Sequence, residues 1–343
     1  MQESESAAET NMVDGIIRWE TIPCDLCGAN EPERLLDGID WEYGLSAALR
    51  VVQCGQCGLI YLNPRPTLSS IPLIYPPSYG YYREARGLRR LLKLAYRRMT
   101  SPYPYLDGVK PGRILDVGCG AGNSNYPYGE KGSLRQLRRK GWDVFGVELD
   151  ESAAEIARSN GISIHTGRLA ENASFGESFD VVRFNHVLEH SVSPTKDLSI
   201  AAALLKENGR LIVSGPNIGS AAFFLFQKYW SGLDLPRHFY HFTPSTLRIF
   251  CENAGLRIHS EYHDGRVMDV VHSLKHFLQS AEVIGRNSAC QGTEVAGGNA
   301  IGNLFSPLSR VCGYMAAQTL VSRFNRMKLS DNYTVVAVPG SVR

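Results

Sequence analysis

The chain has 343 residues, of which 43% are hydrophobic and 20% charged, and its formal net charge is +2. This length suits one large domain with a smaller attachment, and the near-neutral charge argues against a dedicated nucleic-acid-binding protein. Residues 1–12 are acidic and polar, the reverse of a secretory signal, and no apolar run reaches the roughly 20 residues of a membrane helix, so we expect a cytoplasmic protein.

Two cysteine pairs follow a predicted disordered tail at residues 1–14. Each pair has the form Cys-x-x-Cys-Gly, and the four thiolates belong to Cys24, Cys27, Cys54 and Cys57. This spacing predicts one tetrahedral zinc ion in a small ribbon of short strands over residues 15–66. Because all four ligands are thiolates, no coordination position is left open. We therefore expect a structural zinc ion that supplies folding free energy.

The region 67–106 is predicted to be a linker followed by a basic amphipathic helix. Residues 64–82 are rich in proline and tyrosine, and residues 83–99 place apolar side chains on one helical face and arginines and a lysine on the other. We interpret the basic face as a solvated surface. A phosphate-bearing substrate and an anionic membrane surface are the alternatives that the sequence leaves open.

An apolar strand containing Asp116 runs directly into three glycines, Gly118, Gly120 and Gly122. Such a turn brings the backbone of a parallel sheet close to a nucleotide-like ligand. A second apolar strand, about thirty residues later, ends in Glu148, whose carboxylate is placed to accept both ribose hydroxyls of an adenosine ligand. The two signals together predict a pocket for an adenosine-containing cofactor.

A third segment, from residue 179 to residue 190, completes a recognisable series. The order and approximate spacing of LDVGCGAG, GVELD, FDVV and HVLEH resemble those of the class I S-adenosylmethionine-dependent methyltransferases, over roughly residues 107–264 and the last strand. The resemblance implies an α/β fold, a doubly wound, mostly parallel seven-stranded sheet of Rossmann-like type, in a methyltransferase domain over residues 107–343. It also implies that S-adenosylmethionine is the cofactor, bound by Asp116, Gly118, Cys119, Gly120, Gly122, Glu148, Leu149, Leu169, Asn185 and His186.

Several segments of the domain depart from or extend that pattern. Residues 123–132 are inserted before a helix predicted at 133–140, and a helix that begins at Ser193-Pro194 is expected to continue to Gly209. A helical insertion at about 264–330 contains predicted helices at 267–283 and 307–326, separated by a glycine-rich segment. Packing on the core is the default for this insertion, and covering the site, forming a homodimer and meeting a membrane-attached acceptor are its alternatives.

Candidate catalytic residues lie in the stretch from Pro236 to Phe242. This stretch resembles the PRHxYHF segment of polysaccharide and natural-product methyltransferases, and His238 matches a histidine that sugar C-methyltransferases place beside the acceptor. Those enzymes carry glutamate where this chain has Arg237, which favours oxygen over carbon as the accepting atom. Histidine titrates near neutrality, so we predict a histidine general base, with His238 first, followed by His241 and His186.

The sequence thus predicts a methyltransferase that acts on a hydroxyl of a sugar, a glycan precursor or a secondary metabolite. The zinc ribbon supports this class of small-molecule acceptor, because it resembles the N-terminal ribbon of a subset of methyltransferases acting on sugars, nucleotide-sugars and related metabolites. A NAD-dependent oxidoreductase and a non-catalytic zinc-ribbon binding protein with a vestigial fold are the alternatives. The acidic residue ahead of the glycines argues against the first, and the complete set of pocket residues against the second.

Overall fold

The computed structural model describes residues 16–45, 47–75, 104–123, 132–169, 175–176, 178–288 and 307–340, with the backbone alone for 281–288 and 307–316. Several predicted segments lie outside the described residues, in whole or for the most part. They are the tail at 1–14, the basic helix at 83–99, the loop inserted after Gly122, and the part of the glycine-rich segment that follows residue 288.

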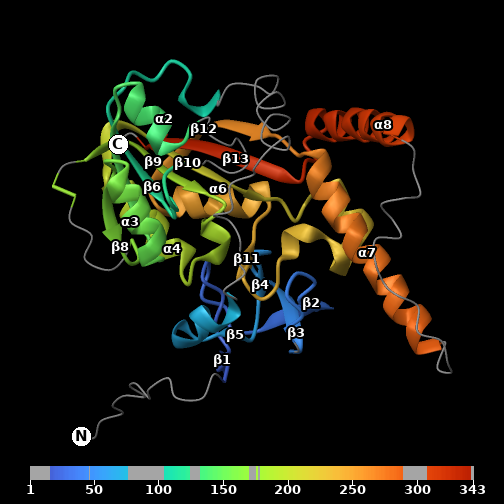
Figure 1. Cartoon of the computed structure of the whole chain (residues 1–343). Helices are drawn as coiled ribbons and strands as arrows, with labels where there is room; N and C mark the ends of the chain where they lie inside the picture. The colour runs from blue at the N-terminus through green and yellow to red at the C-terminus, as the bar shows by residue number, and fades with distance from the viewer. Residues whose placement is uncertain are drawn as a thin grey trace, which may run out of the picture.

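A seven-stranded sheet forms the centre of the larger part of the chain (Figure 1). Its strands, in spatial order, are β8 (Ser163–Thr166), β7 (Asp143–Glu148), β6 (Arg113–Val117), β9 (Phe179–Asn185), β10 (Leu205–Pro216), β13 (Asn332–Pro339) and β12 (Leu256–His263). Within this sheet β13 runs opposite to its neighbours, and the remaining pairings from β8 to β10 are parallel. The predicted seven-stranded, mostly parallel, Rossmann-like sheet is confirmed.

Both faces of the sheet are covered, because successive strand residues point to opposite sides. Leu115 and Val182 belong to one apolar core, whereas their neighbours Ile114 and Val181 belong to a second. The helices are α2 (Leu134–Arg139), α3 (Glu151–Ser159), α4 (Pro194–Ala203), α5 (Ala221–Phe226), α6 (Pro244–Asn253), α7 (Val267–Ser288) and α8 (Pro307–Arg326). Side chains of α2 and α3 pack in the second core and those of α4 and α6 in the first, which is the doubly wound arrangement.

Two predicted helices have different ends in the structure. α4 stops at Ala203 rather than continuing to Gly209, because Leu205 already pairs with Phe179 as the first residue of β10. Leu205 satisfies the helical spacing of the apolar residues before it, but its backbone is used by the sheet. The helix predicted at 267–283 continues to Ser288 as α7, whereas the helix predicted at 307–326 is observed as α8.

The N-terminal segment forms a second, smaller layer below the main sheet in Figure 1. Its strands are β1 (Trp19–Glu20), β2 (Pro32–Gly38), β3 (Leu49–Cys54), β4 (Ile60–Leu62) and β5 (Arg65–Pro66). β2, β3 and β4 are antiparallel, and the sheet is extended at β4 by β11 (Tyr240–His241), which comes from the larger domain. The ribbon therefore shares a sheet with the segment in which the sequence predicts catalytic histidines.

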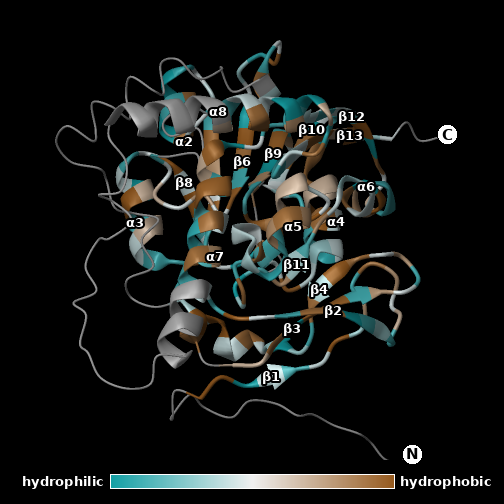
Figure 2. Ribbon diagram, turned by 90° about the vertical axis from the view of Figure 1, so that its right-hand side faces the viewer, coloured by the Kyte–Doolittle hydropathy of each residue, from teal (hydrophilic) through white to brown (hydrophobic). Residues whose placement is uncertain are grey.

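The first core continues from the main sheet into this ribbon without a break. Val51 and Leu62 of the ribbon belong to the same buried cluster as Leu115 and Val213 of the main sheet. Figure 2 shows hydrophobic residues along the central strands, along α5 and along α7. Among the described residues, the helices are too short or too polar to cross a membrane.

Candidate active site

The loop after β6 has backbone conformations at Gly118 and Gly122 that require glycine. Gly118 and Gly122 both have a φ of +67°, in the left-handed region that other residues avoid. A Cβ on Gly118 would lie 2.4 Å from a methyl carbon of Val187, and one on Gly122 would lie 2.2 Å from Ile162. Cys119, between them, is 6% exposed and packs beneath the loop, so a ligand above it would meet its backbone.

Glu148 ends β7 beside this loop. Its Oε2 accepts a hydrogen bond from the backbone N–H of Gly120 at 2.7 Å, and its Oε1 accepts one from Asp150 N–H at 3.0 Å. Burial raises the pKa of the carboxyl group, and these N–H groups oppose that effect. The next residue, Leu149, is 59% exposed. A carboxylate and an exposed apolar side chain at the carboxyl edge of neighbouring strands suit the ribose and the adenine of an adenosine cofactor.

Asp116 forms a buried ion pair with Arg183 of β9, which donates through Nε and Nη2 to the two carboxylate oxygens. The same guanidinium also donates to the carbonyl of Gly132 at 2.7 Å, just before α2. The pair ties β6 and β9 to the start of α2, at the point where the strand order reverses. That Asp116 also contacts the cofactor stays a prediction.

Leu169, another predicted cofactor contact, is 4% exposed and packs in the first core.

Asn185 and His186 follow at the carboxyl end of β9. His186 has a φ of +55°, and its Nδ1 lies 3.5 Å from Oε1 of Glu189. Glu189 belongs to the short 3-10 helix Leu188–His190 and is 1% exposed. Burial alone would raise the pKa of its carboxyl group, but His186 and the charges of His238 and His190 lower it to about 2. His186 and Glu189 thus form a dyad at the sheet edge.

His190 and His238 lie edge to face, with ring centroids 4.6 Å apart. Nδ1 of His190 donates to the carbonyl of Arg237 at 3.0 Å, and Nδ1 of His238 donates to the carbonyl of Gly232 at 2.9 Å. Burial, with His238 nearby, lowers the pKa of His190 to about 4. Nδ1 of each ring therefore carries a hydrogen, and Nε2 of His238 lies 3.8 Å from Oδ2 of Asp234.

His241 of β11 lies at the back of this group. Its ring centroid is 6.4 Å from that of His238, and the residue is 3% exposed. Burial and the nearby His238 lower its pKa to about 3. The structure therefore brings together all three predicted catalytic histidines, and it adds Glu189 and His190, which the sequence offered only as letters of the HVLEH motif.

Arg237 fixes the segment that carries His238. Its guanidinium donates to Asp40, in the ribbon, at 2.8 and 3.1 Å and to Asp234 at 2.7 and 2.9 Å. The side chains of Arg237 and Asp40 are each 1% exposed. Arg237 thus links the two parts of the chain, a role that nothing in its sequence surroundings indicated.

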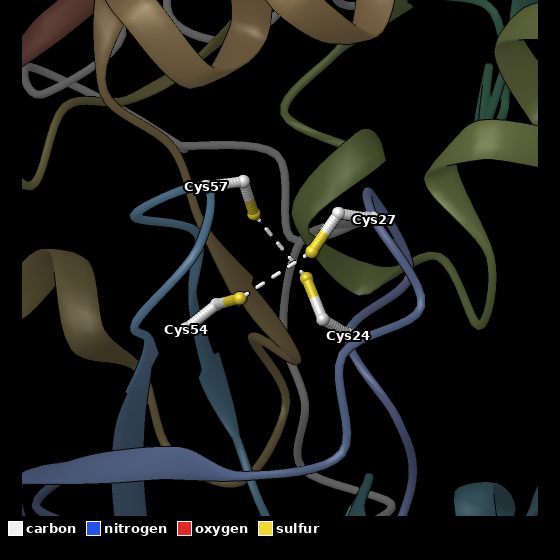
Figure 3. A group of neighbouring side chains, drawn as sticks. All are labelled: Cys24, Cys27, Cys54 and Cys57. Atoms are coloured by element: carbon white, nitrogen blue, oxygen red, sulfur yellow. Dashed lines mark hydrogen bonds between the residues drawn. The ribbon is translucent and has the colours of Figure 1, made fainter.

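The four ribbon cysteines converge, as Figure 3 shows. Sγ of Cys24 lies 3.4 Å from Sγ of Cys57, and Sγ of Cys27 lies 3.4 Å from Sγ of Cys54. Thiolates around one zinc ion at about 2.3 Å would be roughly 3.8 Å apart, so the arrangement fits a tetrahedral ion. Among the described residues, this is one of two clusters that could hold a metal; the other contains Glu189, His190 and His238.

The first cysteine knuckle also contacts the larger domain directly. Asp25 accepts hydrogen bonds from Ser193 Oγ at 2.7 Å and from Thr195 N–H at 2.9 Å, at the start of α4. Nearby, Arg65 of β5 donates to the carbonyl of Val192 at 2.7 Å and to the hydroxyl of Tyr240 at 3.2 Å. The ribbon is therefore anchored on the chain that leads from the histidine cluster into α4.

A family model described as "Methyltransferase domain" matches residues 82–261, more than half of the chain. The chain belongs to this methyltransferase family. The prediction of an S-adenosylmethionine-dependent methyltransferase domain is confirmed at this level, and the ribbon is present as a cysteine cluster.

Individual curated relatives are similar to about half of this chain. A ubiquinone biosynthesis O-methyltransferase of Azoarcus sp. (strain BH72) is 30% identical over 166 residues, which are 44% of this chain and 66% of that protein. Another, of Bradyrhizobium diazoefficiens, is 27% identical over 175 residues, 50% of this chain and 62% of that protein. The chain spans less than two thirds of the length of these relatives.

Solved structures match more distantly. A S-adenosylmethionine-dependent methyltransferase from Archaeoglobus fulgidus has a TM-score of 0.42 at 18% identity, covering 74% of this chain and 95% of that one. A magnesium protoporphyrin IX methyltransferase from Synechocystis PCC 6803 has a TM-score of 0.39 at 21% identity, covering 54% and 84%.

Proposed function

We propose that the protein transfers a methyl group from S-adenosylmethionine to a hydroxyl oxygen of a small-molecule acceptor. The observation that carries the proposal is the convergence of two groups of residues at one edge of the sheet. The glycine loop and Glu148 follow β6 and β7, and the dyad of His186 and Glu189 follows β9. In open α/β sheets, ligands bind at this edge, where the strand order reverses.

The cofactor side is formed by the loop from Gly118 to Gly122, by Glu148 and by Leu149. The loop offers backbone groups at close range, Glu148 offers a carboxylate to the ribose hydroxyls, and Leu149 offers an exposed apolar surface. S-adenosylmethionine supplies a methyl group on a sulfonium, which is already electrophilic. The protein therefore has to orient the acceptor and take up a proton.

The proton acceptor is a histidine of the cluster. His186 has the arrangement of an oriented base, because Glu189 faces its Nδ1 and leaves Nε2 to receive the proton. His238 is held in the same tautomer by the carbonyl of Gly232. His241, with a pKa of about 3 and no more than 3% exposure, is the weakest base of the three predicted residues.

The acceptor proposed from the sequence is a sugar, a glycan precursor or a secondary metabolite. Oxygen as the accepting atom is supported by the names of the relatives from Azoarcus and Bradyrhizobium, which are O-methyltransferases. The replacement of glutamate by Arg237 supports it too, because this side chain is fully engaged by Asp40 and Asp234. The zinc ion of the ribbon is proposed to be structural.

Calorimetric titration of the full-length protein tests the cofactor assignment. Micromolar binding is expected for S-adenosylmethionine and for its demethylated product, and none for NAD. A Glu148→Ala variant should lose at least tenfold in affinity, since it lacks the carboxylate for the ribose, whereas Glu155→Ala, on the exposed side of α3, should bind as the parent does. Binding of NAD alone would favour the oxidoreductase, and binding of none of the three would favour the vestigial fold.

A further inference from the structure

Three side chains beside the dyad are arranged as metal ligands. One potential ligand atom from each of Glu189, His190 and His238 lies within 4.8 Å of the other two. The exposures of these residues are low, 1% for Glu189 and 8% for His238. The cluster is separate from the four cysteines, and its residues come from the 3-10 helix after β9 and from the segment before β11.

The hydrogen bonds of the His190 and His238 imidazoles engage Nδ1, so Nε2 of each ring is the candidate ligand atom. A carbonyl oxygen can only accept, so the bonds to Arg237 and Gly232 place a hydrogen on Nδ1 of His190 and of His238. In the neutral imidazoles, Nε2 of each ring then carries the lone pair that a metal requires, and Nε2 of His238 also lies 3.8 Å from Oδ2 of Asp234. Metal-binding histidines in proteins usually donate their other N–H to a carbonyl or carboxylate in this way, which fixes the ring and its tautomer.

Glu189 supplies the second, independent observation. Both of its carboxylate oxygens are buried, and neither has a hydrogen-bond partner among the described residues. Its contact with His186, at 3.5 Å, is at the outer limit of hydrogen-bond length. A buried carboxylate whose oxygens lack hydrogen-bond partners is costly beyond what nearby imidazoles compensate, and a divalent cation bound to it would offset that cost. A small hollow lined by Gly215, Phe242 and Tyr333 adjoins this carboxylate.

We propose that Glu189, His190 and His238 bind a divalent transition-metal ion of the zinc type, in addition to the zinc ion of the ribbon. Two imidazoles and one carboxylate are the ligands of many catalytic zinc sites, and they leave coordination positions open. Imidazole ligands select transition metals over magnesium, which prefers oxygen. The cluster adjoins His186, the proposed base, through Glu189.

The role of the ion rests on the proposed function. An acceptor hydroxyl bound at an open position would have a lowered pKa, as water does on zinc. Its proton would pass to Nε2 of His186, its oxygen would form the bond to the methyl carbon, and the carbon–sulfur bond would break with its electron pair remaining on sulfur. His238 would then be a metal ligand, and His186 the base.

Metal analysis of the full-length protein tests the site without reference to activity. The protein is equilibrated with zinc, dialysed against metal-free buffer and analysed by mass spectrometry. We expect two zinc ions per chain in the parent, one in Glu189→Gln, one in His238→Ala and one in Cys27→Ser. His259→Ala, an exposed histidine on β12, is the matched control and should retain two. One zinc ion in the parent and none in Cys27→Ser would overturn the proposal.

Substitution with Co²⁺ provides a second readout, which holds even if a pocket variant fails to fold. A tetrathiolate site gives intense thiolate-to-cobalt absorption, whereas a nitrogen and oxygen site gives weak visible bands alone. Cys27→Ser should lose most of the intense absorption and keep the weak bands, and loss of all bands would contradict a pocket ion. Binding of S-adenosylmethionine, measured on the same samples, separates the two proposals: cofactor binding without a second ion overturns the metal site alone, and a second ion without cofactor binding overturns the function alone.

Discussion

At the scale of single residues, the buried charges are concentrated where the two parts of the chain meet. Arg237 is enclosed by Asp40 from the ribbon and Asp234 from its own segment, and it lies 4.8 Å above the ring of Tyr43. Burial lowers the pKa of this guanidinium, but the two aspartates raise it by more. Removing one partner of such a group leaves an uncompensated buried charge, which is strongly destabilising.

Arg237→Met should therefore lower the free energy of unfolding by about 3–5 kcal/mol, measured by urea denaturation with the zinc ion bound. The matched control is Arg248→Met, which breaks an ion pair with Glu261 whose arginine is 44% exposed, and should cost about 0–1 kcal/mol. Equal losses in the two variants would show that the buried network adds nothing beyond a surface pair.

Asp331 makes stability depend on pH. It is 7% exposed, and burial together with Asp269 raises its pKa to about 6, although Trp230 and Ser220 donate hydrogen bonds to its Oδ1. Between about pH 4 and pH 6 the folded state holds a proton that the unfolded state has lost. Stability from this group is therefore full below pH 4 and is lost as the pH rises through 6.

Asp331→Asn removes this titration and keeps an oxygen for the same two donors. From pH 4 to pH 7, the free energy of unfolding of the parent should fall relative to the variant by about 2–3 kcal/mol, at about 1.4 kcal/mol for each pH unit between the two pKa values. Urea denaturation at several pH values measures the difference. Parallel curves for the two proteins would mean that Asp331 titrates normally when folded.

At the scale of elements, β11 is the connection between the ribbon and the histidine cluster. It is two residues long, and it pairs Tyr240 with Tyr61 and His241 with Ile60. The backbone N–H of Leu62 also donates to the carbonyl of Phe239 at 2.8 Å, next to His238. β11 and Phe239 thus connect the segment of His238 to the ribbon that carries the four cysteines.

Cys27→Ser, which removes one proposed zinc ligand, should lower Tm by about 5–15 °C, because losing several kcal/mol shifts Tm by roughly 2–4 °C for each in a chain of this size. Turnover should decrease at least tenfold as β4 and β11 loosen. Affinity for S-adenosylmethionine should be unchanged, since the glycine loop and Glu148 belong to other elements. Differential scanning and titration calorimetry check both expectations, with Gln56→Ser, exposed in the second knuckle, as the control.

At the scale of the whole molecule, the ribbon and the methyltransferase domain share one apolar core and one antiparallel sheet. The link through Asp25 to the start of α4 and the buried ion pair of Arg237 add polar contacts to this interface. The ribbon is therefore part of the fold rather than a tethered module. The alternatives for the insertion, namely packing, a cover, a dimer or a membrane contact, stay predictions, although α7 exposes Val271, Leu274 and Phe277 by 44–47%.

Because the two parts share a core, the zinc-loaded protein should unfold in one cooperative transition, with equal calorimetric and van't Hoff enthalpies. Differential scanning calorimetry gives both values from one experiment. Limited proteolysis before the transition should leave residues 16–75 attached and intact. A separate low-temperature transition that follows the zinc concentration would instead show that the ribbon unfolds independently.

Local sequence patterns were sufficient to predict several elements and candidate site residues of this protein. The glycines after β6, the carboxylate at the end of β7 and the two Cys-x-x-Cys-Gly pairs each depend on a few neighbouring residues, so their placement could be predicted. The strand order followed from the resemblance to a family, and the main helices from apolar spacing. The prediction failed at Leu205, where the same apolar residue satisfies a helix and a strand, and sheet pairing with Phe179 decides between them.

Only the tertiary structure showed what joins the segment of His238 to the ribbon. The pairing of β11 with β4 joins residues about 180 positions apart, and the ion pair of Asp40 with Arg237 spans 197 positions. The tertiary structure also places Glu189 and His190, from the HVLEH motif, next to His238, from the PRHxYHF-like stretch, so that the three residues form one cluster. No local pattern records such contacts, because sequence periodicity reflects the chain's own geometry, whereas burial and charge pairing arise when distant segments exclude water from one another.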